Sequence, residues 1–347
     1  MAFPNPVRFL FGTQATLQAE DHRRATRGLI ADGICSTSMV TLQGGPFLPA
    51  FILALGGSRS AVGLLATIVL ASQVMQVAGL YLVRRLNRRR GIVVIAASLS
   101  RLMWVPIILI PMLFLDQGVR MVTAMVLLSA FIGMVAGPSW NSLIRDLVPP
   151  DRMGAVFSTR MLLGTACALV LTLGGGYFVD TWKAAFPEYA LHGYSILFGL
   201  GLIFGLAGVT AIARLPEPQM EPVERRPLRK ELVIPLRDRN FRGLLGYVAL
   251  WTFAINLAIP FFIVYMLERL DLSLTMVTAL TVTSQVTSMA FLRVWGRLAD
   301  RYSNRSVLEA SAPLFLLSVL AWSFTTMPEK HMLTIPMLFG IDRKSVV

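Results

Sequence analysis

Histidine, cysteine and acidic side chains are scarce in this sequence of 347 residues. The three histidines (His22, His192 and His331) and the two cysteines (Cys35 and Cys167) lie far apart and form no cluster with metal-ligand spacing. We therefore expect no metal, no cofactor and no disulfide framework. Paired carboxylates, or a serine nucleophile beside a base, are not evident either, which disfavours an enzyme.

Charged residues are also few, since only 15% of the residues are charged while 55% are hydrophobic. A soluble domain carries about 25% charged residues. The mean hydropathy of +0.65 points the same way, so the sequence predicts an all-α integral membrane protein that crosses the bilayer many times. The first 27 residues are mixed and charged, and they do not read as a signal peptide.

Nine apolar spans are each long enough to cross a bilayer of about 30 Å as a helix. A tenth run, 332–341, would rise only about 15 Å, or half a bilayer. Pro46, Pro49, Pro106 and Pro111 lie inside spans, where they are tolerated and predict kinks. The nine spans cover residues 28–54, 60–83, 91–115, 119–143, 154–178, 193–213, 243–266, 274–293 and 306–327.

Positive charge is distributed unevenly between the two sets of connections. Arginines and lysines crowd the N-terminus and the connections after the second, fourth, sixth and eighth spans. The opposite connections carry only Arg59, Arg120, Lys183, Arg269 and Lys330. Because positive charge collects on the cytoplasmic side, this predicts a cytoplasmic N-terminus, in a bacterial cytoplasmic (inner) membrane. The same asymmetry explains the net charge of +13 without nucleic acid as a partner.

A proline-rich, charged connection and an internal repeat define the predicted organisation. Pro46-Phe47 and Ser72-Gln73-Val74 recur as Pro260-Phe261 and Ser284-Gln285-Val286, which predicts two parallel halves. The second half would be incomplete, so we expect a chain truncated at its C-terminus; a natural nine-helix protein with a short tail is the alternative. The predicted parts are a cytoplasmic segment (1–27), a six-helix bundle (28–213), a cytoplasmic linker (214–242), a partial bundle (243–341) and an artificial or truncated end (342–347).

A densely charged stretch, Gly296 to Arg305, interrupts the apolar pattern between the eighth and ninth spans. It reads Gly-Arg-Leu-Ala-Asp-Arg-Tyr-Ser-Asn-Arg, and so many charges predict a loop facing water. The stretch resembles the signature loop of the major facilitator superfamily of secondary transporters. The resemblance implies that fold, with nine full helices and a partial tenth of an expected twelve. It also implies a gating role for Gly296, Asp300, Arg301 and Arg305.

Two further connections resemble the same family to different degrees. The segment Gly137–Gly154 resembles the junction between the fourth and fifth helices of many facilitator proteins, with Asp146, Pro149, Arg152 and Gly154 as shared positions. The loop after the second span, Arg84–Arg90, keeps the basic charge but has no aspartate. We therefore expect that loop to orient the chain in the membrane, without a gating role.

Charged residues inside apolar spans are costly and are candidates for function. Asp32 lies in the first span and Arg101 in the third. Arg101 could pair with Asp32 or with a helix end, and Arg145 is a competing partner for Asp32 because both lie near the cytoplasmic face. A structural ion pair and a direct role of Asp32 in coupling both remain open; if protons drive transport, Asp32 is the expected carrier.

Polar and aromatic residues also accompany one another in the first, fourth and seventh spans. The family arrangement places these helices around a central cavity, so the side chains could line a substrate path. Interhelical hydrogen bonds explain the polar ones equally well. The candidates are Gln43, Trp140, Asn141, Trp251, Phe253 and Asn256.

The function predicted on these grounds is secondary active transport of a small solute by a rocker-switch mechanism, with protons as a further partner. A transporter-like sensor or scaffold that moves nothing is the main alternative. A membrane-embedded enzyme is a weaker one. The motifs name no substrate, no direction of transport and no oligomeric state.

Overall fold

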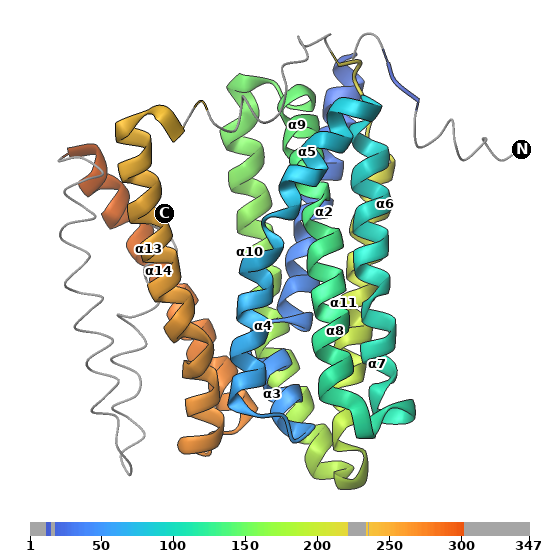
Figure 1. The fold of residues 1–347 in the computed structure, drawn as a ribbon, viewed down its shortest axis with the longest axis vertical. Coiled ribbons are helices and arrows are strands. Elements are labelled where there is room, and N and C mark those ends of the chain that lie inside the picture. The colour runs from blue at the N-terminus through green and yellow to red at the C-terminus, as the bar shows by residue number, and fades with distance from the viewer. Residues whose placement is uncertain (1–11, 15–17, 221–233, 235, 302–347) are drawn as a thin grey trace, which may run out of the picture. The chain divides into compact units, whose positions relative to one another are not determined.

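The computed structural model describes residues 12–14, 18–220, 234 and 236–301. Helices dominate this part of the chain, as predicted (Figure 1), and an isolated β-bridge joins Gln14 to Pro218. In chain order the elements are α2 (Ala19–Gln43), α3 (Phe47–Ala54), α4 (Arg59–Ser72), α5 (Met75–Leu86), α6 (Arg89–Leu102), α7 (Trp104–Leu113), η1 (Leu115–Gln117), α8 (Gly118–Met134), α9 (Ala136–Leu147), α10 (Pro150–Ala185), η2 (Pro187–Tyr189), α11 (Ala190–Ala213), α13 (Arg239–Val264), η3 (Tyr265–Arg269) and α14 (Leu274–Arg301).

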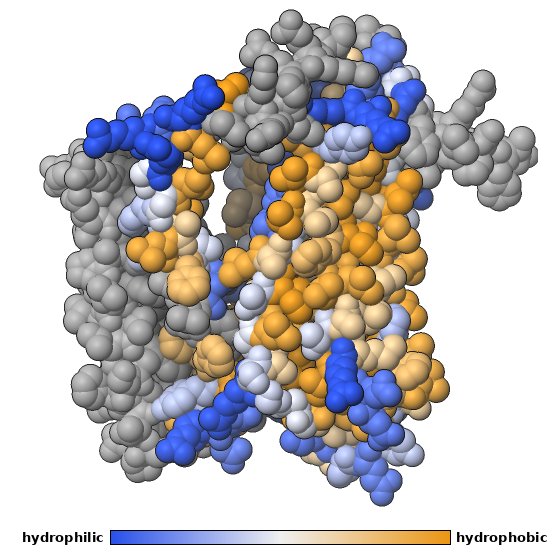
Figure 2. Space-filling view, viewed as in Figure 1, coloured by the Kyte–Doolittle hydropathy of each residue, from blue (hydrophilic) through white to orange (hydrophobic). Residues whose placement is uncertain are grey.

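These elements cover the first eight predicted spans, from 28–54 to 274–293. Two predicted spans, 306–327 and 332–341, lie outside the described residues. Within the residues that are described, five helical segments are long and apolar enough to cross a membrane: Arg59–Leu86, Arg89–Leu113, Leu115–Leu147, Pro150–Ala185 and Pro187–Ala213. Figure 2 shows hydrophobic residues over the middle of these segments and hydrophilic residues at their ends. The chain is therefore an integral membrane protein.

Prolines account for three of the breaks that divide a span into two helices. A proline has no N–H, and its ring clashes with the carbonyl four residues earlier. Pro46 follows the end of α2, after Gly45 in a left-handed conformation (φ +48°) that glycine tolerates. Pro106 lies four residues after the end of α6, and Pro138 lies four residues after the end of α8. The break between α4 and α5 contains no proline, and nothing in the structure explains it.

The chain separates into two compact units. Unit 1 contains Met1–Leu171 and Trp182–Val264, and unit 2 contains Thr172–Thr181 and Tyr265–Val347. In unit 2, Asp180 accepts hydrogen bonds at the start of α14 from the Thr275 N–H (2.6 Å) and the Leu274 N–H (3.3 Å). A carboxylate there satisfies free N–H groups and complements the helix dipole.

Two observations bear on predicted boundaries. Residues Gly296–Arg301 are helical and close α14, so the expectation of a loop beginning there is wrong for its first six residues. A helix that runs past the hydrocarbon into water keeps its own backbone hydrogen bonds, so charge alone need not end it. α13 begins at Arg239, four residues before the predicted 243. The proposed division into domains stays a prediction.

Helices α2 and α11 pack extensively against each other in unit 1. Gly201, Gly205 and Gly208 form one stripe on α11, and the side chains of α2 lie directly against it. A methyl group at Gly205 would lie 2.5 Å from the sulfur of Met39, and one at Gly208 would lie 3.2 Å from Cys35 Cβ. Small residues in membrane helices allow this close approach. Polar side chains of α2 are thereby buried against a neighbouring helix.

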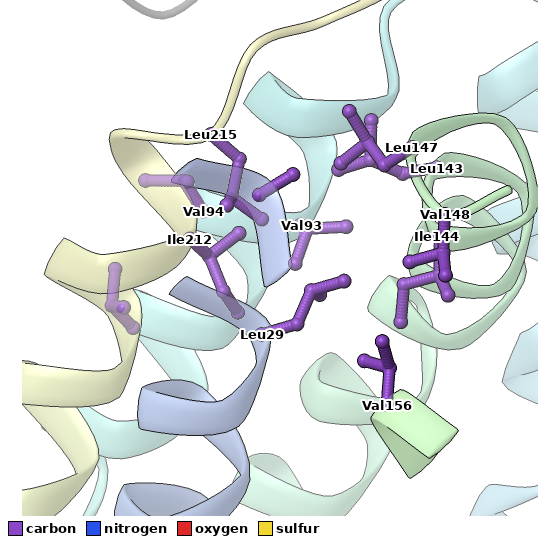
Figure 3. Close-up of a cluster of buried hydrophobic side chains, with 12 residues drawn as sticks. Leu29, Val93, Val94, Leu143, Ile144, Leu147, Val148, Val156, Ile212 and Leu215 are labelled. Atoms are coloured by element: carbon purple, nitrogen blue, oxygen red, sulfur yellow. The ribbon is translucent and has the colours of Figure 1, made fainter. Parts of the chain in front are cut away.

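One end of unit 1 is closed by a hydrophobic cluster. At this end, which we call the N-face, α2, α6 and α10 begin and α5, α9 and α11 end. Figure 3 shows side chains from α2, α6, α9, α10 and α11 pointing toward one another beneath it, among them Leu29, Val93, Ile144 and Ile212. The cluster anchors the helix ends, so charged groups deeper in the bundle have fixed neighbours.

Candidate functional site

The carboxylate of Asp32 is the centre of a buried charged cluster in unit 1. Asp32 is 2% exposed on α2. Its Oδ1 accepts a hydrogen bond from the Ser36 hydroxyl at 2.8 Å, and its Oδ2 pairs with Arg160 Nη2 of α10 at 3.3 Å. The fourth member, Arg101 of α6, is 7% exposed and donates from Nη2 to Ser36 Oγ at 3.3 Å.

This cluster contains one carboxylate and two guanidinium groups. Arg101 Nη1 and Arg160 Nε are buried without a hydrogen-bond partner in the described structure. Buried donors of this kind are rare and call for an explanation, such as a ligand or a second conformation. The Asp32 cluster (Asp32, Ser36, Arg101 and Arg160) therefore carries an excess of positive charge and has spare donors.

The local sequence explains how three helices bring charge together here. Gly33 on α2 lies where a methyl group would be 2.6 Å from Arg160 Nε, so only glycine leaves room for that guanidinium. Gly164 on α10 packs in the same way against the side chain of Thr37. Glycines beside the carboxylate thus permit α10 to approach α2 and deliver its arginine.

The Asp32 cluster lies deep in the bundle. Asp32 lies five residues past Arg27, about 7.5 Å along α2, and Arg160 lies eight residues past Arg152, about 12 Å along α10. Half of a hydrocarbon core is about 15 Å. Ionisable groups at this depth are expensive and mark functional sites by default.

Trp140, a predicted substrate-path residue, belongs to this neighbourhood. The Arg160 guanidinium lies over its ring at 5.0 Å from the centroid, close enough for a cation–π contact. Trp140 also meets Phe157 edge-on, with ring centroids 6.3 Å apart. An aromatic wall therefore adjoins the arginine that binds Asp32.

The structure corrects the expected partner of Asp32. Arg145 does not reach the carboxylate, because it lies two residues from the end of α9 at the N-face; its side chain is 79% exposed, and its Nε is 3.7 Å from Asp146 Oδ1. Arg101 joins the cluster through Ser36, as one of the expected alternatives. The direct partner, Arg160, was missed, although an arginine six residues into the apolar span 154–178 was a visible signal.

Two further predicted path residues belong to α2 and α9. Gln43 is 2% exposed and donates from Nε2 to the Phe198 carbonyl of α11 at 3.2 Å, while its Oε1 has no hydrogen-bond partner among the described residues. This contact is the interhelical hydrogen bond expected as the alternative to a path. Asn141 is exposed on α9. Whether either residue lines a path stays a prediction.

The remaining path candidates are on α13. Trp251 stacks on Tyr247 with ring centroids 6.3 Å apart, and Phe253 is 63% exposed. Asn256 donates to the Thr252 carbonyl of its own helix at 2.8 Å. These contacts follow the α13 backbone, and the roles of the three residues in a path stay predictions.

A second charged network is buried at the N-face and centres on Arg89, which is 1% exposed. Its Nη1 binds Asp146 and donates to the Ser142 carbonyl at 3.1 Å, and its Nη2 donates to the Pro218 carbonyl at 2.9 Å. The side chain of Glu217 accepts the backbone N–H of Arg89. The expectation that the arginine-rich loop only orients the chain misses this network, because its carboxylates come from distant segments.

The gating residues expected from the motif have no described side-chain contacts. Gly296, Asp300 and Arg301 lie on α14, where only the course of the helix is described. Arg305 lies outside the described residues. Their role stays a prediction.

The profile of the Major Facilitator Superfamily matches residues 33–341. This match covers most of the sequence and includes both halves of the repeat. The chain belongs to this superfamily. The resemblance seen in the charged motif is thereby confirmed, and membrane transport is the activity of the family. No curated protein matches the sequence.

Solved transporters have the same fold as this superfamily member. The nucleoside transporter NupG, in a mutant form, superposes with a TM-score of 0.67 at 12% identity, over 92% of this chain and 79% of NupG. A D-xylose–proton symporter gives 0.63 at 16% identity, over 94% and 79% of the two chains. A bacterial homologue of the human lysosomal transporter Spinster, inward-facing and unoccupied, gives 0.59 at 15% identity, over 95% and 74%.

Proposed function

We propose that this protein is a secondary active transporter that moves a small solute by rocker-switch alternating access, and that the Asp32 cluster couples solute movement to protons. The observation that carries the proposal is the ion pair between the buried Asp32 and the partly buried Arg160, both inside apolar spans. The superfamily and the transporters that share its fold support membrane transport. A D-xylose–proton symporter among them makes protons a reasonable first driving ion to test.

The energetics of the pair suggest how coupling would work. Removing one partner of a buried ion pair costs about 3–5 kcal/mol, because the other charge stays buried and unpaired. Protonation of Asp32 would leave Arg160 and Arg101 without an anion. A shift from 1:99 to 99:1 between two conformations needs about 5.5 kcal/mol, so neutralising this single carboxylate supplies most of the required bias.

The charge state of Asp32 decides which of the two conformations is favoured. With Asp32 ionised, α2, α6 and α10 are held together at the cluster. With Asp32 neutral, the two arginines gain by moving toward water or toward an anion. Proton binding would therefore favour a second arrangement of these helices, which is the requirement for alternating access.

The first experiment tests transport itself. The protein is reconstituted in liposomes with an imposed proton gradient, and uptake of radiolabelled D-xylose and nucleosides is followed, since transporters of these solutes share the fold. Other small solutes are then screened by their effect on thermal unfolding. Gradient-dependent accumulation is expected for a solute that binds. A solute that binds but never crosses the membrane would support the sensor or scaffold alternative.

The second experiment tests coupling at Asp32. Asp32→Asn should abolish accumulation driven by the gradient and leave exchange of labelled for unlabelled solute intact. Asp151→Asn is the matched control, because Asp151 undergoes the same chemical change but is 75% exposed at the start of α10. Undiminished accumulation in Asp32→Asn would rule out the proton role and leave a structural ion pair.

A further inference from the structure

A cavity with arginines on its rim opens between the beginning of α2 and the end of α11. Its volume is about 510 Å³, within the range of about 300–1,000 Å³ usual for ligand pockets. It belongs to unit 1 and lies at the N-face, and its lining contains no member of the Asp32 cluster. Its lining includes Arg24, Arg27, Gly28, Ala31, Ala211 and Arg214.

The three arginines are exposed and have no recorded partner. No hydrogen bond or ion pair of Arg24, Arg27 or Arg214 occurs in the part of the chain that the structure describes. Two acids on the same helix, Asp21 and Glu20, lie three and four residues before Arg24, and neither forms an ion pair with it among the described residues. Three guanidinium groups around one opening attract an anion with several acceptor oxygens.

The walls of the cavity are apolar, because the side chains between the arginines are small. Gly28 leaves α2 so close to the end of α11 that a methyl group there would lie 2.6 Å from Leu215 Cδ2. Ala31 and Ala211 complete the lining on the two helices. A ligand held here would therefore present an anionic head to the arginines and hydrocarbon to the walls.

An exposed apolar stripe on α11 leads from this cavity into the membrane. Ile196, Leu200 and Ile203 are 46%, 39% and 66% exposed. Helical spacing of 3.6 residues places them on the same face as Arg214. Ile203 is eleven residues from Arg214, about 16 Å along the axis, which is close to the hydrocarbon thickness of one leaflet, about 15 Å.

We propose that this cavity binds an anionic phospholipid, with the phosphate on Arg24, Arg27 and Arg214 and an acyl chain along the α11 stripe. Basic pockets between membrane helices bind anionic headgroups, and each arginine near the surface strengthens such binding. The site depends on neither the transported solute nor proton coupling. It holds on whichever side of the membrane the N-face lies.

Native mass spectrometry of the full chain, with dioleoyl-phosphatidylglycerol and dioleoyl-phosphatidylcholine in competition, tests the site. We expect phosphatidylglycerol to be preferred, and Arg24→Gln/Arg27→Gln/Arg214→Gln to weaken its binding by about tenfold to a hundredfold. Arg23→Gln/Arg239→Gln/Arg242→Gln removes the same charge from exposed positions outside the cavity. This control should keep its affinity within about twofold of the parent protein.

Additional variants and a competition with inorganic phosphate distinguish the possible causes of a loss of lipid binding. Ala31→Leu fills the cavity without a change in charge and should also weaken phosphatidylglycerol binding, with thermal unfolding in phosphatidylcholine as the check on folding. Equal loss in the control triple variant would overturn the proposal in favour of general surface charge. Inorganic phosphate that displaces the lipid at equal concentration would overturn it in favour of a soluble phosphate ligand. Unchanged binding in Ala31→Leu would exclude the cavity.

Discussion

Helix α2 carries charge at two depths, and the two places are built differently. Asp32 is 2% exposed and has a guanidinium and a hydroxyl as partners. About two turns toward the helix start, Arg24 and Arg27 are exposed, with no recorded partner among the described residues. On α2, therefore, the buried charge of Asp32 has an ion-pair partner. The exposed charges of Arg24 and Arg27, near the membrane surface, are available to a ligand.

The difference shows how solvent decides the role of a charged residue. A buried charge without a partner costs several kcal/mol, so it persists only with counter-charge and hydrogen bonds arranged around it. An exposed arginine is hydrated at almost no cost and is free to bind a ligand. Stability should therefore depend strongly on the Asp32 cluster and hardly on the surface arginines.

The largest expected effect comes from Asp32→Ala. It leaves the buried Arg101 and the partly buried Arg160 without their carboxylate, which should lower the free energy of unfolding by about 3–5 kcal/mol. Reversible unfolding in mixed micelles, followed by tryptophan fluorescence, measures this. Asp151→Ala, at a 75% exposed position, should change it by less than about 0.5 kcal/mol. Equal effects at the two aspartates would contradict the comparison.

Arg89→Gln should come second. Hydrogen bonds to charged groups are each worth about 1.5–3 kcal/mol, but Asp146 is 34% exposed and water can hydrate it after the change. We expect a loss of about 2–3 kcal/mol in the same unfolding assay. Arg85→Gln, at an exposed position in the last turn of α5, is the control. If Arg89→Gln lowered the free energy of unfolding as much as Asp32→Ala does, the number of partners of a charged group would matter more for stability than its depth in the bundle.

Gly208→Leu should have a smaller effect of about 1–3 kcal/mol, typical of overpacking. Its side chain would press on the α2 face that carries Asp32, since a methyl group alone lies 3.2 Å from Asp32 Oδ1. Gly199 is on the same helix and faces open space, so Gly199→Leu is the matched control. If Gly199→Leu were destabilised as well, the loss of stability would come from replacing glycine within α11 and not from the interface between α11 and α2.

Sequence alone predicted the helical membrane fold, because long apolar runs have few other solutions in a bilayer. It also pointed to Asp32 and Arg101, since each is a rare charge in an apolar span. The breaks near Pro46 and Pro106 followed from the missing N–H and the ring clash of proline. All of these are local properties that a single stretch of sequence displays.

The partners in the site could not be predicted in the same way. Whether Asp32 meets Arg145 or Arg160 depends on how far each arginine lies along its helix and on whether glycines, here Gly33 and Gly164, allow that helix to approach α2. The burial of Arg89 depends on Asp146 and Glu217, which lie far away in the chain. Such pairings are set by tertiary packing, which the order of residues does not show.

The smallest expected effect is the sharpest test of the comparison. Arg24→Gln/Arg27→Gln removes two charges that have no recorded partner among the described residues, so in phosphatidylcholine micelles the free energy of unfolding should change by less than about 0.5 kcal/mol. In micelles with phosphatidylglycerol the parent protein should gain stability by mass action, by about 2.7 kcal/mol when the free lipid is a hundredfold above its dissociation constant. The variant should gain much less. An equal gain in stability in both proteins would show that the arginines at the start of α2 bind no ligand. Their difference from Asp32 would then be only that water hydrates them.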